Sequence, residues 1–144
     1  PVPPRAHRRV AFTLVEILIV VVILGILAAI VVPQYGRAAD DAARTAALDQ
    51  LEKLRRALMV YYVRNNSAWP DVSEGNGTWG ALIDPTYMRS APVNPWVGGG
   101  NNQRVILRSS PDTGFQSTHA WIFDPATGQV WAGAFDGQDN PWPR

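Results

Sequence analysis

Glu16 stands out chemically because it is the only charged residue in the longest apolar stretch of the chain, residues 12–32. Placing a carboxylate in the hydrocarbon of a membrane costs roughly 2.5–3.5 kcal/mol at the centre of a helix. An ionisable side chain in such a segment therefore predicts a functional role. Because the segment has no Lys or Arg, the partner of Glu16 is expected on another chain or at the start of the helix.

A basic cluster precedes the apolar stretch and consists of Arg5, His7, Arg8 and Arg9. Secretory signal peptides have the same charge order, but their apolar region is usually shorter and ends at a small-residue cleavage site. The stretch that reaches Val32 suits one bilayer crossing, which requires about 20 apolar residues. Because basic residues remain on the cytoplasmic side, the chain after Val32 is predicted to lie across the membrane.

Residues 11–16, which read AFTLVE, resemble the processing site of type IV pilins and of the related pseudopilins of type II secretion. The resemblance implies that a prepilin peptidase cleaves between Ala11 and Phe12 and that Phe12 is N-methylated. It also implies that Glu16 acts in assembly. Ala11 departs from the family pattern, in which Gly usually precedes the cut. The alternative to processing is an uncleaved membrane anchor.

Gly25 and Pro33 match the helix-breaking positions of that family. Pro33 has no N–H to donate, and Gly is a poor helix former, so both weaken a helix. We expect a kink at Pro33 in the isolated subunit and loss of helicity only in a filament.

The chain is predicted to have a basic leader that is removed, a transmembrane and assembly helix, and a periplasmic pilin-like domain, at residues 1–11, 12–33 and 34–144. The periplasmic domain divides into an amphipathic helix, a loop-rich connector, and a sheet with a C-terminal loop, at residues 34–65, 66–102 and 103–144. The connector resembles that of the major pseudopilin in its Tyr87, Met88, Pro92, Asn94, Pro95 and Trp96.

The predicted fold class is α+β, with one long helix over residues 14–65 packed on a small antiparallel sheet. Apolar residues at helical spacing form the stripe that would face the sheet: Ala47, Leu51, Leu54, Leu58 and Tyr61. Acid–base pairs one turn apart occupy the other face: Asp40 with Arg44, Asp49 with Lys53, and Glu52 with Arg56. Strands are predicted at residues 104–108, 118–123 and 129–134, the last two joined by a hairpin loop.

Tryptophan is abundant, with 6 residues in the chain. We expect Trp121 and Trp131 to fill the core from their strands. Trp69, Trp79 and Trp142 lie in predicted loops and are the candidates for an exposed contact with a partner or a carbohydrate.

The sequence contains no recognisable catalytic constellation, so we predict that the protein is not an enzyme. It has no Cys, and His7 lies in the predicted leader. His119 is expected to be a packed or surface residue, and no zinc spacing is present. The net charge of +1 gives no reason to expect a nucleic-acid partner.

Asp136, Asp139 and Asn140 surround Gly137 near the C-terminus. Oxygen ligands next to a Gly turn are typical of calcium sites. The major pseudopilin carries a calcium loop in its C-terminal region, so the resemblance makes Asp136 and Asp139 the calcium candidates. The pattern here is shorter and differs from that loop, and we favour a plain acidic turn without a cofactor.

The favoured function is that of a pseudopilin, a structural subunit of a type II secretion filament. The expected location is the bacterial inner membrane, with one membrane pass and a periplasmic C-terminal domain, followed by a periplasmic or extracellular filament. The implied partners are the membrane, identical or related pilin-like subunits, the prepilin peptidase, and the inner-membrane assembly platform with its ATPase. One alternative is a type IV pilus subunit for adhesion, motility or DNA uptake. Many type IV pilins close their C-terminal loop with a disulfide, which a chain without Cys cannot form. The other alternative is a membrane-anchored periplasmic binding module.

Overall fold

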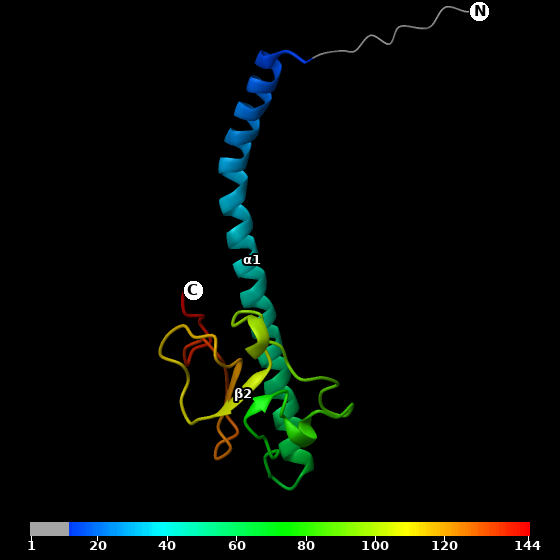
Figure 1. Cartoon of the computed structure of the whole chain (residues 1–144). Coiled ribbons are helices and arrows are strands. Elements are labelled where there is room, and N and C mark those ends of the chain that lie inside the picture. Colours follow the sequence, from blue (N-terminus) through cyan, green and yellow to red (C-terminus); the bar gives the residue numbers. More distant parts are fainter. Residues whose placement is uncertain (1–11) are drawn as a thin grey trace, which may run out of the picture. The chain divides into compact units, whose positions relative to one another are not determined.

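The computed structural model describes residues 12–144, and Figure 1 shows its elements. In chain order they are helix α1 (Leu14–Arg64), strand β1 (Gly75–Asn76), the 3-10 helices η1 (Gly80–Leu82) and η2 (Gly99–Asn101), and strands β2 (Arg104–Leu107), β3 (Trp121–Phe123) and β4 (Val130–Ala132). The predicted leader, with Ala11 and the basic cluster, lies outside the described residues. The chain divides into two compact units, with the boundary between Ala38 and Ala39.

Helix α1 confirms the long helix predicted from the sequence, and it runs without a break from Leu14 to Arg64. In the unit that begins at Ala39, the apolar stripe of the helix faces the sheet, as predicted. Ala47, Leu51, Leu54 and Leu58 are buried and Tyr61 is half-buried. Burial of a Leu side chain contributes about 1.5–3 kcal/mol, so this stripe is a main source of helix stability.

The sheet has four strands in the order β1-β2-β3-β4. Strand β3 pairs antiparallel with β4, but β2 pairs parallel with β3, with Val105 opposite Trp121. The α+β class is confirmed, whereas the prediction of a purely antiparallel sheet is wrong. Residues 108–120 connect β2 to β3 and are long enough to return the chain to the same end of the sheet, which a parallel pair requires. Strand β1 was missed because its Gly-Asn sequence has the composition of a turn.

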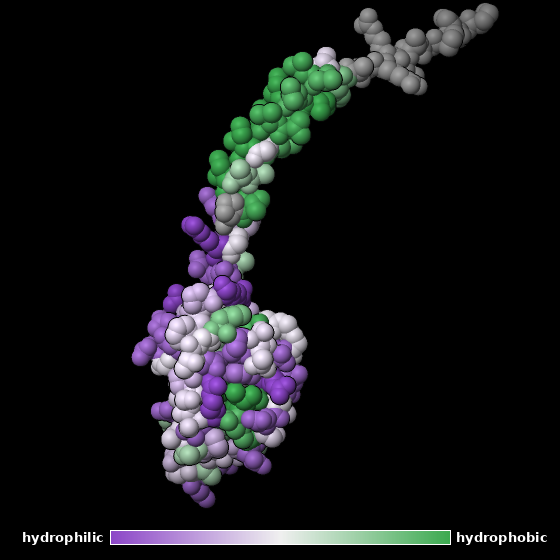
Figure 2. Space-filling model, turned by 60° about the vertical axis from the view of Figure 1, so that its left-hand side comes forward, coloured by the Kyte–Doolittle hydropathy of each residue, from purple (hydrophilic) through white to green (hydrophobic). Residues whose placement is uncertain are grey.

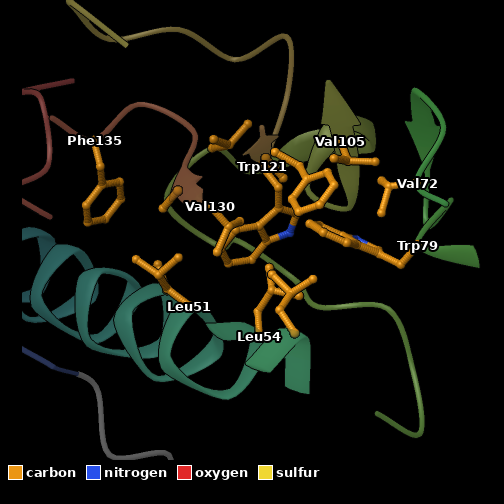
Figure 3. Close-up of a cluster of buried hydrophobic side chains, with 14 of the residues drawn as sticks. Leu51, Leu54, Val72, Trp79, Val105, Trp121, Val130 and Phe135 are labelled. Atoms are coloured by element: carbon orange, nitrogen blue, oxygen red, sulfur yellow. The ribbon is translucent and has the colours of Figure 1, made fainter. Parts of the chain in front are cut away.

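The core lies between α1 and the sheet, and Figure 3 shows Leu51 and Leu54 of the helix facing Trp121 and its neighbours. Trp121 is fully buried, as predicted, and its indole N–H donates to the carbonyl of Pro92 over 3.0 Å. Trp131 is only half-buried, because it points to the opposite face of β4 from Val130 and Ala132.

The interpretation of Trp79 as an exposed loop residue is wrong, since its side chain is fully buried and meets Phe123 edge-on with ring centroids 6.0 Å apart. Its Nε1 has no hydrogen-bond partner in the described part of the chain, so packing alone holds the ring. Trp69 and Trp142 are half-buried. Trp69 stacks on Tyr62 at 4.2 Å, and the indole N–H of Trp142 donates to the carbonyl of Asp112.

The loop-rich connector is fixed to the sheet by Asn94, which is fully buried. Its amide nitrogen donates to the carbonyls of Ala120 and Gly133, each over 3.0 Å, and its oxygen accepts the N–H of Trp96. A buried amide with its groups satisfied in this way holds the connector against the ends of β3 and β4.

The predicted ion pairs on α1 are confirmed in two of the three cases. Asp49 meets Lys53 at 2.6 Å and Glu52 meets Arg56 at 3.1 Å, both on the exposed face. Asp40 does not pair with Arg44 but with Arg144, at 3.0 Å. The guanidinium of Arg144 is already held by main-chain carbonyls, so this pairing requires less ordering of side chains than one with Arg44 does.

Candidate assembly site

Glu16 lies in the first turn of α1 and closes the start of the helix. Its Oε2 accepts hydrogen bonds from the main-chain N–H and the hydroxyl of Thr13, both over 2.8 Å. The hydroxyl of Thr13 in turn accepts the N–H of Glu16 over 3.2 Å. This reciprocal arrangement is a capping box, in which Thr precedes the helix and Glu follows three positions later.

Thr13 and Glu16 have the Thr-x-x-Glu spacing that is the known signature of a capping box, but only a charge partner was predicted for Glu16. No hydrogen bond to the second carboxylate oxygen, Oε1, is formed within residues 12–144. The carboxylate is therefore held at the end of the helix with one oxygen engaged and one available to a cation. That geometry fits a group that caps its own helix and also meets a positive charge on another chain.

The segment that follows Glu16 exposes its apolar side chains, and Figure 2 shows one face of it as a mostly apolar surface. Ile17 is 53% exposed, and the exposure extends to Val32, which is 67% exposed. By length and composition, α1 can cross a membrane. An apolar surface of this size needs lipid or other apolar helices around it.

Gly25 and Pro33, the predicted helix-breaking positions, both lie within α1, and the helix continues through them. A Cβ added to Gly25 would meet no atom within 4 Å. Nothing inside the single subunit therefore requires glycine at this position. Gly and Pro both have a low helix propensity. The loss of helicity near Gly25 and Pro33 in a filament stays a prediction.

The calcium candidates Asp136 and Asp139 do not fit a cation site. Both oxygens of Asp139 accept hydrogen bonds from Arg55, and Asp136 accepts the N–H groups of Gln138 and Asn140, each over 2.8 Å. The Asn140 N–H lowers the pKa of Asp136 and outweighs the small desolvation that raises it. Residues 12–144 contain no group of three or more acidic, His or Cys side chains arranged for a metal.

A buried charged cluster that the sequence did not reveal is centred on Asp112, in the connection between β2 and β3. Its carboxylate accepts hydrogen bonds from Arg108, Gln116 and the N–H of Ala134, over 2.5, 2.9 and 2.8 Å. With its proton on Nε2, His119 donates to the same carboxylate over 3.1 Å. Burial raises the pKa of Asp112, but the bonds from His119, Ala134 and Arg108 outweigh it and hold that pKa well below its usual range.

This cluster has a structural role. Thr118 Oγ1 lies 3.0 Å from His119 Nδ1, which completes a hydroxyl–imidazole–carboxylate series. The Thr118 hydroxyl, however, also lies 2.9 Å from the side-chain oxygen of Gln116, and the imidazole is buried with 6% exposed. The prediction that His119 is a packed residue is confirmed. The cluster around Asp112 joins the β2–β3 connection to Ala134, two residues after the end of β4.

Comparison with known proteins gives a consistent result. The chain is similar to the type II secretion system core protein G of Pseudomonas aeruginosa, with 40% identity over 103 residues that cover 62% of this chain and 70% of the relative. The protein of the same name in Klebsiella michiganensis is 33% identical over 132 residues, which cover 79% and 91% of the two chains. That of Vibrio cholerae is 31% identical over 113 residues, which cover 71% and 73%.

No protein-family model and no solved structure matches the chain. The curated relatives nevertheless carry one name, and the alignment to the Klebsiella protein extends over nearly all of that relative. The fold agrees with the pilin-like prediction, since one long N-terminal helix precedes a small sheet. The chain therefore belongs to the family of type II secretion system core protein G, the major pseudopilins.

Proposed function

We propose that this chain is the subunit of a secretion filament, inserted once in the bacterial inner membrane and then assembled through its N-terminal helix. The observation that carries the proposal is the apolar surface of α1 with a capped carboxylate at its beginning. An apolar helix that leaves lipid must find equal burial elsewhere, and the helices of identical or related subunits offer it. The role is structural and requires no catalytic centre or cofactor.

The proposed contact for Glu16 is the N-terminal amine of a neighbouring subunit. The capping box supports this contact because it keeps the carboxylate at the end of the helix, where an amine of a neighbour could reach Oε1. In a dry helix core, a pair of opposite charges is strong only when both members are present, because either charge alone is costly to bury. The amine itself depends on cleavage between Ala11 and Phe12, followed by N-methylation.

Processing, insertion and extraction would involve a prepilin peptidase, an inner-membrane platform and its ATPase. The basic cluster supports an orientation with the N-terminus in the cytoplasm and the unit from Ala39 onward in the periplasm. The names of the relatives favour secretion over a type IV pilus, and none of them is named for ligand binding.

Mass spectrometry of the membrane-extracted protein tests the proposal. In a host that has prepilin peptidase, we expect a chain that starts at N-methylated Phe12. A host that lacks the peptidase should retain the leader and serves as the control. An intact leader in the first host, or a cut after Val32, would exclude the proposed processing.

Genetic complementation distinguishes a function in type II secretion from a function in a type IV pilus. A strain deleted for its own core protein G, but with the rest of the secretion system, should regain secretion of its exoprotein when this chain is expressed. A pilus-deficient strain should not regain its pili. Restored pili without restored secretion would favour the type IV pilus alternative.

A further inference from the structure

The C-terminal segment, residues 136–144, is held on helix α1 by two arginine–carboxylate contacts of opposite polarity. In the first, Arg55 of the helix meets Asp139 through two parallel hydrogen bonds of 2.6 and 2.9 Å. The same guanidinium donates to the carbonyl of Val130 over 3.2 Å. Arg55 therefore joins the helix, the acidic turn and strand β4 at one point.

In the second contact the charges are reversed, since the segment supplies Arg144 and the helix supplies Asp40. Arg144 donates to the Asp40 carboxylate over 3.0 Å and to the carbonyl of Trp96 over 2.8 Å. Its guanidinium also lies 4.3 Å from the centre of the Trp96 ring, which is within the range of a cation–π contact. Asp40 and Arg55 are about four helical turns apart, so the segment is fixed at two separate points.

The acidic turn itself is closed by hydrogen bonds from its own backbone. Asp136 donates its N–H to the carbonyl of Asn140 over 2.9 Å, and the N–H of Asp139 donates to the carbonyl of Asp136 over 3.2 Å. Asp139 has a φ of 63°, a left-handed conformation that a tight turn demands. These main-chain hydrogen bonds define the shape of the turn without a bound ion.

A calcium ion needs six to eight oxygen ligands at about 2.3–2.6 Å. The carboxylate of Asp139 has both oxygens bonded to a guanidinium, and the Asp136 carboxylate is bonded to N–H donors. An ion at this turn would have to displace Arg55 and would be repelled by its charge. The planar guanidinium supplies the positive charge and the bidentate geometry that the carboxylate requires.

We propose that Arg55 takes the place of a metal ion at the C-terminal turn, so that this subunit closes its C-terminal segment on the helix without calcium. The proposal concerns the folded unit alone and does not depend on how the subunits assemble. It also explains how a chain without Cys fastens its C-terminal segment, since residues Arg55 and Arg144 provide the cross-links to distant parts of the chain.

The test uses the full chain purified in detergent. Thermal unfolding followed by circular dichroism should give the same Tm in calcium chloride and in EGTA. Equilibrium dialysis with radioactive calcium should find no stoichiometric binding. A Tm that falls in EGTA, or one calcium bound per chain, would overturn the proposal without any variant.

Substitution of Arg55 tests the second half of the proposal. Arg55→Gln should lower the Tm by about 4–8 °C, the shift that a loss of about 1 kcal/mol causes in a unit of this size. It should also let carboxypeptidase remove the C-terminal residues faster. The matched control is Arg56→Gln, which removes the adjacent, exposed pair with Glu52 and should leave both readouts unchanged. Equal Tm values and equal digestion rates for Arg55→Gln and Arg56→Gln would refute the role of Arg55. The double variant Arg55→Asp/Asp139→Arg exchanges the two charges of the pair, and a Tm above that of Arg55→Gln would support the proposal.

Discussion

At the scale of single residues, Glu16 caps its own helix in the structure, and its pairing with a charge on another subunit is the role that we propose for it. Its position in an apolar segment predicted a charge partner, whereas the structure adds the capping box with Thr13. The two roles are compatible because the capping contacts use one carboxylate oxygen. They differ in what they require, since capping needs an acceptor oxygen at Glu16 and pairing needs a negative charge.

Glu16→Gln and Thr13→Val separate these roles. Gln also functions at this position of a capping box, so Glu16→Gln keeps the cap and loses the charge. Thr13→Val keeps the charge and loses the hydroxyl cap, at about 1 kcal/mol of helix stability. We expect Glu16→Gln to abolish filaments and secretion as sole subunit, while Thr13→Val retains most of both at equal membrane levels. The reverse ranking would mean that Glu16 acts through the cap.

Asp112 makes the folded unit sensitive to acid. Because its pKa in the folded protein is far below that of the unfolded chain, its contribution to stability is complete above about pH 5 and is lost as the pH falls further. Urea unfolding should therefore show a falling free energy of unfolding between about pH 5 and pH 2. Asp112→Asn should flatten this slope and cost about 1–3 kcal/mol at pH 7, because one of the two accepting oxygens is lost and buried donors such as His119 and the N–H of Ala134 compete for the other. The exposed Asp71→Asn is the control, and an unchanged slope in Asp112→Asn would contradict the assignment.

At the scale of elements, the sequence predicted correctly those features that depend on residues close together in the chain. The apolar spacing from Ala47 to Leu58 gave the helix and its buried face correctly, because helix geometry depends on residues that are close in sequence. The parallel pairing of β2 and β3 could not be predicted, because it depends on the path of the connecting residues 108–120, which no local pattern reveals. Trp79 was misplaced for the same reason, since only the tertiary structure buries its loop.

Pro33 tests whether α1 changes in the filament. The helix is continuous through Pro33 in the single subunit, so replacing it with Ala removes about 3 kcal/mol of unfavourable propensity from a helix that forms anyway. If assembly requires a loss of helicity here, Pro33→Ala should insert normally and yield far fewer filaments. Gly36→Ala stabilises the same helix by about 1 kcal/mol at an open position and should assemble normally. Normal filament yield from Pro33→Ala would rule out local melting as a requirement.

At the scale of the whole molecule, the unit from Ala39 onward holds together without disulfides through one apolar core and a few buried polar anchors. The core joins the helix stripe to Trp79, Trp121 and Phe135. Asn94 fixes the connector and Asp112 fixes the β2–β3 connection, each through contacts between segments far apart in the sequence. Such anchors are invisible in a sequence because their partners are main-chain groups, which every residue has.

Because this core is complete within residues 39–144, the membrane segment should be dispensable for folding. The side chains of residues 12–32 are exposed in the single chain, so removing them uncovers no buried surface. A chain that starts at Tyr35 should be soluble and monomeric by light scattering, and it should unfold cooperatively with mixed helix and sheet content by circular dichroism. Its Tm should match that of the full chain in detergent. Aggregation, or a Tm several degrees lower, would mean that the sheet needs the membrane segment or a neighbouring subunit to fold, and assembly would then contribute to folding as well as to secretion.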